Sequence, residues 1–268
     1  MTTYSALMSV YYKEIASNLL ESVESVMKQT IPPNDFVLVC DGPLTDSLDT
    51  CISELCKKYS NIQVIRLEKN QGLGEALNIG LKYAENEIIL RMDSDDICVP
   101  ERAEQELLLM NEYDLVGSWV QEFEGDVANV IGIREVPEFF DDILKFSKMR
   151  CPFNHPSVMF KKSAIQEVGG YKSLMFVEDY FLWVRFLHKN KKAYNIQKPL
   201  VFMRSGKEMR SRRGGKIYRK SLKQVRKYML SHKMINRFEY FKASIMQNLF
   251  LLTPIKLKVF LYKKFLRR

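Results

Sequence analysis

The chain has 268 residues, 46% of them hydrophobic, which is enough for one sizeable α/β domain with an appendage. Its five cysteines are an odd number without a CxxC pair, which argues for a reducing compartment and against a disulfide framework or a structural zinc site. The net charge of +9 is unevenly divided: residues 204–268 carry 20 Lys and Arg against two Glu, which is +18, whereas residues 1–203 carry 21 against 30 Asp and Glu, which is −9.

The N-terminal part alternates between short apolar runs and segments of helical spacing. Strands are predicted at residues 5–12, 36–40, 62–67 and 88–92, and helices at 15–29, 47–59 and 73–83. This alternation is typical of βαβ units around a parallel sheet, which binds ligands at the carboxyl ends of its strands. Asp41 and Asp93 each follow such a strand, so both are expected to face the same crevice.

Three carboxylates follow the fourth predicted strand, in the segment Asp93-Ser94-Asp95-Asp96. At positions i and i+2, Asp93 and Asp95 can turn toward one point and offer hard oxygen ligands. Such ligands suit Mg²⁺ or Mn²⁺, especially a cation that also holds a diphosphate. The alternative is a solvated acidic turn or a helix N-cap, because Pro100 soon follows as in a first helical turn. From these residues alone, both interpretations stay open.

Further along the chain, helices are predicted at 102–112, 163–168 and 178–190, and strands at 114–123 and 158–160. The segment 131–152 has a weak pattern and receives no assignment. The N-terminus lacks a basic region followed by an apolar core, so no secretory signal is predicted and the protein is expected in the cytoplasm.

Six short motifs stand in the order found in family 2 glycosyltransferases, which use nucleotide-sugars and have a GT-A fold. They are residues 7–11, 39–42, 70–80, 91–96, 154–157 and 178–179. The chain therefore resembles this family over about residues 5–205. The resemblance implies an α/β fold of the GT-A type, Rossmann-like, with a mostly parallel central sheet flanked by helices. It also implies a catalytic domain at 1–205, with a nucleotide-sugar half at about 1–100 and an acceptor half at about 101–205.

The resemblance implies a UDP-sugar donor and a Mn²⁺ or Mg²⁺ cofactor. Asp41 would accept a hydrogen bond from the uracil N–H, or alternatively would cap the turn that follows it. Asp93 and Asp95 would form the DxD motif, touching the ribose and the cation, which acts as a Lewis acid for the leaving UDP. Asp96 is either a further ligand or an N-cap. The other residues expected on the nucleotide-sugar are Ser9, Val10, Tyr11, Glu14, Asn70, Gly72, Leu73, Asn78, Arg91 and Ser94.

The same resemblance assigns the catalytic pair to Glu178 and Asp179. Inversion at the anomeric carbon needs a carboxylate that deprotonates the incoming hydroxyl, a role we expect for Asp179, with Glu178 tuning or orienting it. The alternative is that both acids only favour a helix N-terminus. His155, Arg204 and Arg210 are expected on the acceptor or phosphate side, although a lone histidine is as often structural.

The basic segment 206–268 is expected to be helical and membrane-associating. Residues 216–233 have amphipathic helical spacing, and the ending mixes aromatic residues with Lys and Arg as interfacial anchors do. The longest uncharged stretch, 243–255, is too short to span a bilayer. These features favour peripheral association with the anionic inner face of the cell membrane. The alternative is a solvated basic helix packed on the catalytic domain.

Together these expectations predict an inverting transferase. It would move one hexose, galactose or glucose, from a UDP-sugar to a polyprenyl-diphosphate-linked saccharide in O-antigen or capsule synthesis. A nucleotidyltransferase is a rival, but it would carry a Gly-rich basic loop after the first strand, where Tyr11-Tyr12-Lys13-Glu14 stands instead. A nucleic-acid-binding protein is a second rival. No recognisable nucleic-acid motif accompanies the basic tail, so no nucleic-acid partner is expected. The sequence leaves the oligomeric state open.

Overall fold

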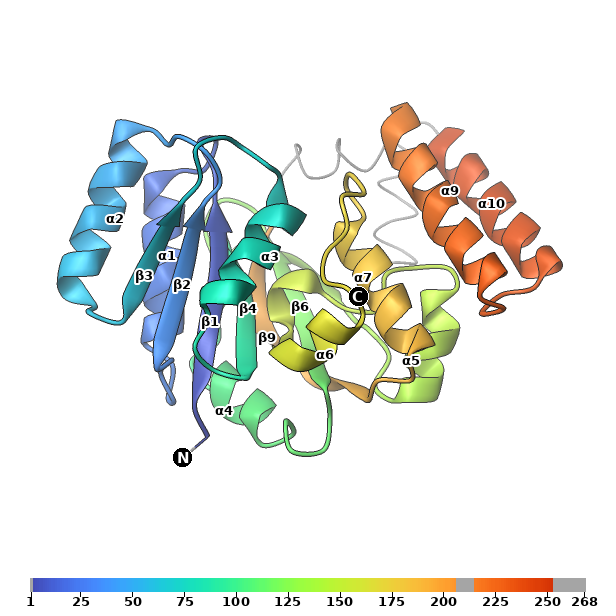
Figure 1. Cartoon of the computed structure of the whole chain (residues 1–268), viewed down its shortest axis with the longest axis horizontal. Helices are drawn as coiled ribbons and strands as arrows, with labels where there is room; N and C mark the ends of the chain where they lie inside the picture. Colours follow the sequence, from blue (N-terminus) through green and yellow to red (C-terminus); the bar gives the residue numbers. More distant parts are fainter. Residues whose placement is uncertain (1, 206–214, 253–268) are drawn as a thin grey trace.

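The computed structural model describes residues 2–205 and 215–252. Its N-terminal part alternates strand and helix as the sequence predicts (Figure 1). The elements in this part are β1 (Tyr4–Val10), α1 (Ala16–Met27), β2 (Asp35–Cys40), α2 (Asp46–Lys58), β3 (Ile62–Arg66), α3 (Leu73–Tyr83) and β4 (Ile88–Asp93). Each apolar run that was predicted to be a strand is one, because its side chains have helices to pack against on both faces of the sheet.

These four strands form a parallel sheet in the order β3-β2-β1-β4. The register pairs Ser9 of β1 with Asp93 of β4, and Val10 of β1 with Cys40 of β2. The carboxyl ends of β1, β2 and β4 therefore meet at one edge. Asp41 and Asp93 lie together at this edge, as expected for a crevice of an open α/β sheet.

Alternate residues of the central strands serve two different cores. Ala6, Met8 and Val10 of β1 point to a core built with α1 and α2, whereas Leu7 points to a core built with α3 and the helix α7 (Glu178–His188). Gly80 of α3 allows that helix to approach closely, because a Cβ there would lie 2.4 Å from Leu7 Cδ1. The result is a three-layer arrangement with the sheet in the middle (Figure 1).

The same sheet continues into the second half, where the pairing becomes mixed. The elements are β5 (Ile97–Cys98), α4 (Arg102–Leu107), β6 (Leu115–Phe123), β7 (Val130–Arg134), α5 (Phe140–Ser147), η1 (His155–Ser157), β8 (Met159–Lys161), α6 (Lys162–Glu167), α7 and β9 (Ala193–Arg204). β8 runs antiparallel between β4 and β6, while β9 runs parallel to β6. The sheet order is thus β3-β2-β1-β4-β8-β6-β9-β5, with β7 added on β6.

Five of these elements, β5, β7, α5, η1 and β9, have no counterpart among the predicted ones. α5 and β7 fill most of the segment that received no assignment. The helix predicted at 102–112 is also shorter than expected. After Leu107 the chain tightens into turns, with the N–H of Leu109 donating to Glu106 O and that of Met110 donating to Leu107 O, three residues back.

Two helices complete the described chain, α9 (Gly215–Ser231) and α10 (Arg237–Leu252), packed side by side at the end of the molecule opposite α2 (Figure 1). Leu222, Val225 and Met229 of α9 are buried against Tyr180 and Val184 of α7. α9 therefore shares a core with the helix that begins at Glu178. Within residues 2–205 and 215–252, no helix has the length and apolar character needed to cross a membrane.

Candidate functional site

Asp41 ties together the two loops that follow β2 and β3. Its carboxylate Oδ1 accepts from the N–H of Gln71 at 2.7 Å and Oδ2 from that of Gly72 at 2.9 Å, while Asn70 Nδ2 donates to the Asp41 carbonyl at 3.1 Å. The side chain is 3% exposed. Asp41 thus orders the loop that leads into α3, and a carboxylate has further lone pairs for a ligand donor. Its expected contact with uracil stays a prediction.

The other residues expected on the donor side gather around the ends of β1 and β4. Ser9 and Val10 are the last residues of β1, and Leu73 begins α3. The Tyr11 ring contacts that of Tyr12 edge-on, with centroids 5.8 Å apart. Glu14 accepts from Ser94 Oγ at 2.8 Å, which links the loop after β1 to the turn after β4. These expected site residues therefore share one neighbourhood.

Asn78 uses its side chain within the protein. Its Oδ1 accepts from the N–H of Tyr171 at 2.8 Å and its Nδ2 donates to the Tyr171 carbonyl at 2.9 Å. Gly170 makes this approach possible, because a Cβ at that position would lie 2.7 Å from Asn78 Oδ1. A nucleotide contact of Asn78 would have to compete with both bonds.

The turn after β4 is a cluster of carboxylates with one buried cation beside it. Arg91 is fully buried and forms an ion pair with the carboxylate of Asp93, which is 30% exposed. Burial, followed by the negative charges of Asp93 and Glu14, raises the pKa of Asp95 to about 7. Burial and the neighbouring Asp95 also raise the pKa of Asp96, which is 1% exposed. Burial is the main cause of both raised pKa values, and the neighbouring carboxylates add to it.

The chemistry of this donor set fits Mg²⁺ or Mn²⁺, because its side-chain donors are oxygens and added positive charge would relieve the repulsion. Among the residues that the structure describes, no three His, Cys, Asp or Glu side chains converge closely enough to hold a metal by themselves. Such cations are commonly held by one or two carboxylates together with substrate phosphates.

Arg204, at the end of β9, forms hydrogen bonds with the acidic turn that follows β4. Its Nε donates to the Asp95 carbonyl at 3.0 Å, its Nη1 to the Gly125 carbonyl at 3.0 Å and its Nη2 to Glu21 Oε2 at 3.0 Å. Its backbone N–H donates to Asp96 Oδ1 at 2.7 Å, so Asp96 holds β9 against the turn. Arg204 was expected on the acceptor or phosphate side, and that contact stays a prediction, because its three side-chain donors serve the protein itself. Arg210 lies outside the described residues.

Glu178 and Asp179 open α7, and their surroundings differ. Burial, then the charge of Asp179, raises the pKa of Glu178 to about 7, and its Oε2 is buried without a hydrogen-bond partner among the described residues. Asp179 instead accepts from the Cys151 thiol, with Sγ 3.7 Å from Oδ2. Burial, together with the charge of Asp179, raises the pKa of Cys151, so the thiol keeps its proton and can donate to this carboxylate.

Tyr171 is a further buried residue of this region that was not identified from the sequence. It is buried, and its hydroxyl shares a 2.9 Å hydrogen bond with His155 Nε2. Burial raises the pKa of Tyr171, and Asp179, Asp93 and Glu178 act on it in the same direction. Tyr171 and Glu178 both approach the start of α3, because a Cβ at Gly74 would lie 3.3 Å from Tyr171 Cβ and 3.6 Å from Glu178 Cβ. Glu178 therefore lies near the start of α3, directly after Gly72, whose N–H donates to Asp41.

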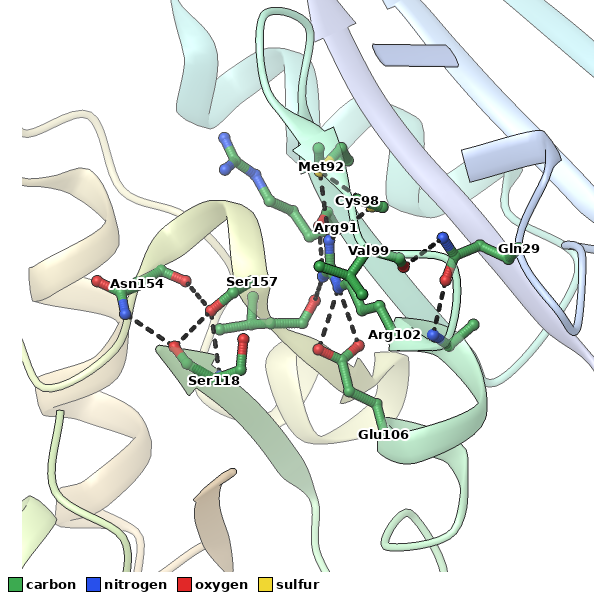
Figure 2. Close-up of polar contacts among 12 residues, drawn as sticks. Gln29, Arg91, Met92, Cys98, Val99, Arg102, Glu106, Ser118, Asn154 and Ser157 are labelled. Carbon is green, nitrogen blue, oxygen red and sulfur yellow. Dashed lines mark hydrogen bonds and ion pairs between the residues drawn. The ribbon is translucent and has the colours of Figure 1, made fainter. Parts of the chain in front are cut away.

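His155 belongs to a buried arrangement rather than to an open surface. Burial, and secondarily the charge of Arg91, lowers its pKa, so the ring is neutral. The segment that carries it is fixed on β6, because Asn154 Nδ2 and Ser157 Oγ both donate to the Ser118 carbonyl, at 2.8 and 2.9 Å (Figure 2). The expected acceptor contact of His155 stays a prediction.

A second buried network lies behind the acidic turn (Figure 2). Arg102 and Glu106 of α4 are both fully buried, with Nε 3.1 Å from Oε1. Arg102 Nη2 donates to the carbonyls of Arg91 at 3.0 Å and Val158 at 3.3 Å, which joins β4 to the segment after His155. In the sequence this is an i,i+4 pair of the kind found on helix surfaces, so nothing local signalled its burial.

Arg91 itself points away from this network (Figure 2). Its Nε and Nη1 are buried and lack a hydrogen-bond partner among the described residues. Its positive charge opposes the rise in the pKa of Glu178 that burial causes, and it adds to the fall in the pKa of His155. It is therefore a buried positive charge that lies close to the acids at both ends of the site.

Comparison with known proteins agrees with this arrangement. The Glycosyl transferase family 2 model matches residues 5–169, and the Glycosyl transferase family group 2 model matches residues 88–266. Over 99% of its length, and 97% of the relative's, the chain is 38% identical to the Escherichia coli "UDP-Gal:alpha-D-GlcNAc-diphosphoundecaprenol beta-1,3-galactosyltransferase". It is 34% identical to the "Amylovoran biosynthesis glycosyltransferase AmsE" of Erwinia amylovora, covering 97% of this chain and 98% of that protein.

Solved structures share the fold at low identity. S. aureus TarS in complex with UDP-GlcNAc matches with a TM-score of 0.71 and 20% identity, over 95% of this chain and 77% of that chain. A mannosyltransferase from Pyrobaculum calidifontis in complex with GDP-Man and Mn²⁺ matches with a TM-score of 0.65 and 14% identity, over 92% and 69%. The GT-A fold expected from the motifs is thereby confirmed. The chain belongs to glycosyl transferase family 2.

Proposed function

We propose that this glycosyltransferase moves one galactose from UDP-galactose to a GlcNAc-diphosphate-polyprenol acceptor in the synthesis of a bacterial surface polysaccharide. The observation that carries the proposal is the 38% identity, over nearly the whole of both chains, to the E. coli enzyme whose name states this donor and acceptor. Of the two hexoses expected from the sequence, this relative favours galactose over glucose.

The donor would bind at the common carboxyl edge of β1, β2 and β4. We assign Asp41 to the uracil side, and Asp93 and Asp95 to a Mg²⁺ or Mn²⁺ that also contacts the diphosphate. When bound, the cation supplies Lewis-acid stabilisation of the negative charge on the departing UDP. The raised pKa of Asp95 supports this assignment, since a nearby cation would favour its ionised form.

Asp179 is our assignment for the base. The Cys151 thiol donates to its carboxylate, which helps to orient that carboxylate at the start of α7. In the proposed step Asp179 accepts the proton of the acceptor hydroxyl, whose oxygen forms a bond to the anomeric carbon. The bond from that carbon to the UDP oxygen breaks, and UDP leaves with its electron pair. Glu178, which has a pKa of about 7, orients or tunes this base.

The protein would work at the inner face of the cell membrane, because the proposed acceptor is anchored there by its lipid. The +18 charge of residues 204–268 supports peripheral association with anionic lipid.

The test is UDP release from UDP-galactose, UDP-glucose and UDP-GlcNAc with a GlcNAc-diphosphate-lipid acceptor, in Mn²⁺, Mg²⁺ or EDTA. We expect acceptor-dependent release from UDP-galactose that EDTA abolishes. Asp95→Ala and Asp179→Ala should each lower kcat by about 10²- to 10⁴-fold, the usual share of a positioned acid or base. Glu54→Ala, an exposed carboxylate on α2, is the control and should have no effect. Full activity of Asp95→Ala would refute the metal assignment, and full activity of Asp179→Ala would refute the base.

A further inference from the structure

The apolar face expected to meet the membrane at residues 216–233 is used inside the protein. Leu222, Val225 and Met229 of α9 are 8%, 0% and 0% exposed, because they pack on α7. Of the two arrangements considered for this segment, α9 therefore adopts that of a basic helix packed on the catalytic domain. Lipid contact through these three side chains would require α9 to leave its core.

α10 has the opposite pattern. Its outward face carries large apolar side chains at helical spacing, and their exposed fractions are 76% for Phe238, 61% for Phe241, 57% for Ile245, 51% for Met246 and 63% for Leu249. A surface helix normally turns its apolar stripe to the core and its polar residues to water. A stripe of this size exposed on one helix marks a surface that meets a non-aqueous partner.

The inner face of α10 is the more polar one. Ala243 is buried, Ser244 Oγ accepts from Arg226 Nη1 at 3.5 Å, and Glu239 pairs with Lys148 at 2.7 Å. These contacts fix which way the helix faces. α10 lies on the outer side of α9, at the end of the molecule (Figure 1).

Exposed positive charges accompany this stripe on the same pair of helices. Lys242 lies on the outward face of α10, and the exposed cations of the two helices include Lys220, Lys223, Lys227 and Arg237. An apolar stripe with Phe and Leu beside Lys and Arg is typical of helices that lie in the interface of anionic membranes. A protein partner would be expected to match the stripe without requiring so many cations.

We propose that α10 lies flat on an anionic lipid surface and inserts the stripe of Phe238, Phe241, Ile245, Met246 and Leu249 into the headgroup boundary. The inference rests on the proposed function, since a lipid-linked acceptor gives the enzyme a reason to dock. It goes further by naming the helix and the face that dock. The exposed cations of α9 and α10 would contact the lipid phosphates.

The first test is co-sedimentation of the full chain, without acceptor, with phosphatidylcholine vesicles that contain or lack phosphatidylglycerol. We expect binding that requires phosphatidylglycerol and weakens with salt. Phe238→Ser/Phe241→Ser should lower the partition coefficient about tenfold or more, the loss expected from two rings that no longer enter lipid. Leu108→Ser is the matched control, because Leu108 is 77% exposed but lies after α4, and it should bind as the unmodified protein does.

A second test places a fluorophore on each surface. Phe241→Trp should gain fluorescence that brominated lipids quench when vesicles are added, whereas the Trp of Leu108→Trp should not respond. Unchanged vesicle binding by the double Ser variant, or equal quenching in both Trp variants, would overturn the proposal. So would loss of a dimer in the double variant, since a second copy would then cover the stripe. A lower Tm of that variant would also overturn it, because the rings would then be covered within the chain.

Activity separates this inference from the proposed function. UDP release with a water-soluble, short-chain GlcNAc-diphosphate acceptor should be the same for the double Ser variant and the unmodified protein. With the acceptor embedded in vesicles, only the variant should slow. If the unmodified protein released no UDP with the soluble acceptor, the proposed function would be refuted. The vesicle-binding result would still test the lipid contact of α10 independently.

Discussion

Glu178 is held in the folded protein with a raised pKa. Burial is the main cause and the charge of Asp179 the second, and together they raise the pKa from its ordinary value of 4.5 to about 7. The folded state therefore prefers the protonated carboxyl. By linkage, this group stabilises the fold below about pH 4.5, and that contribution is lost as the pH rises through about 7.

Glu178→Gln removes this titration and should make stability less sensitive to pH. Relative to the unmodified protein, the variant's free energy of unfolding should rise between pH 5 and pH 8. The gain is at most about 3 kcal/mol, because each pKa unit is worth about 1.4 kcal/mol. Urea unfolding at both pH values, without metal or nucleotide, measures it. Glu54→Gln, exposed on α2, should show the same difference at both pH values. A pH-independent effect of Glu178→Gln would contradict the raised pKa.

At the residue scale, the sequence singled out the candidate acids, whose roles stay predictions, but not the residues that surround them. The candidate acids belong to local motifs at the start or end of an element: Asp93, Asp95, Glu178 and Asp179. Such motifs can be recognised in a single sequence. Tyr171 is different, because its role follows from a loop that Asn78 of α3 holds from 93 residues away. No local pattern encodes such a contact.

At the scale of elements, the site depends on how closely two loops approach each other. Gly42 follows β2 with a φ of +89°, and a Cβ there would lie 2.7 Å from the backbone nitrogen of Asn70, in the loop after β3. This contact is backbone to backbone, so no flexible side chain can yield. The same approach lets Asp41 accept from the N–H groups of residues 71 and 72.

Gly42→Ala should therefore destabilise the protein more than backbone strain alone explains. Gly125→Ala is the matched control, because its φ is +75° but nothing lies within 4 Å of a Cβ there. Strain should cost each variant about 1–2 kcal/mol, and the clash should cost Gly42→Ala about 1–3 kcal/mol more. Urea unfolding measures both. Equal losses would mean that the loops separate easily and that Asp41 holds them only loosely.

The element pattern of the N-terminal half was predictable because each buried parallel strand is a continuous apolar run. β9 was not predictable from the sequence, because Pro199 interrupts it and a proline normally argues against a strand interior. The structure accommodates Pro199 at an irregularity, where the register with β6 shifts around Trp119. β5 has only two residues, and in β7 Gly132 interrupts the short run of Val130, Ile131 and Ile133, so both leave only a weak strand signal.

At the scale of the whole molecule, the charge asymmetry suggested a catalytic part at 1–205 and a separate basic segment at 206–268. α9 nevertheless has no core of its own. Its apolar face completes a cluster with Leu174, Val177 and Tyr180, beside the start of α7. α9 thus packs on and supports α7, the helix that carries Glu178 and Asp179. We therefore expect α9 and the catalytic part to unfold together.

Met229→Ala tests this cooperativity. Met229 is fully buried, so the substitution should cost about 2–5 kcal/mol. Trp fluorescence, which reports on Trp119 in β6 and Trp183 in α7, and far-UV circular dichroism should lose the same stability in one coincident urea transition. Ile217→Ala, 56% exposed on the same helix, should change stability by no more than about 0.5 kcal/mol. If instead circular dichroism showed an early transition while the fluorescence midpoint stayed in place, the C-terminal helices would unfold as a separate unit, and a boundary near residue 205 would be the better description.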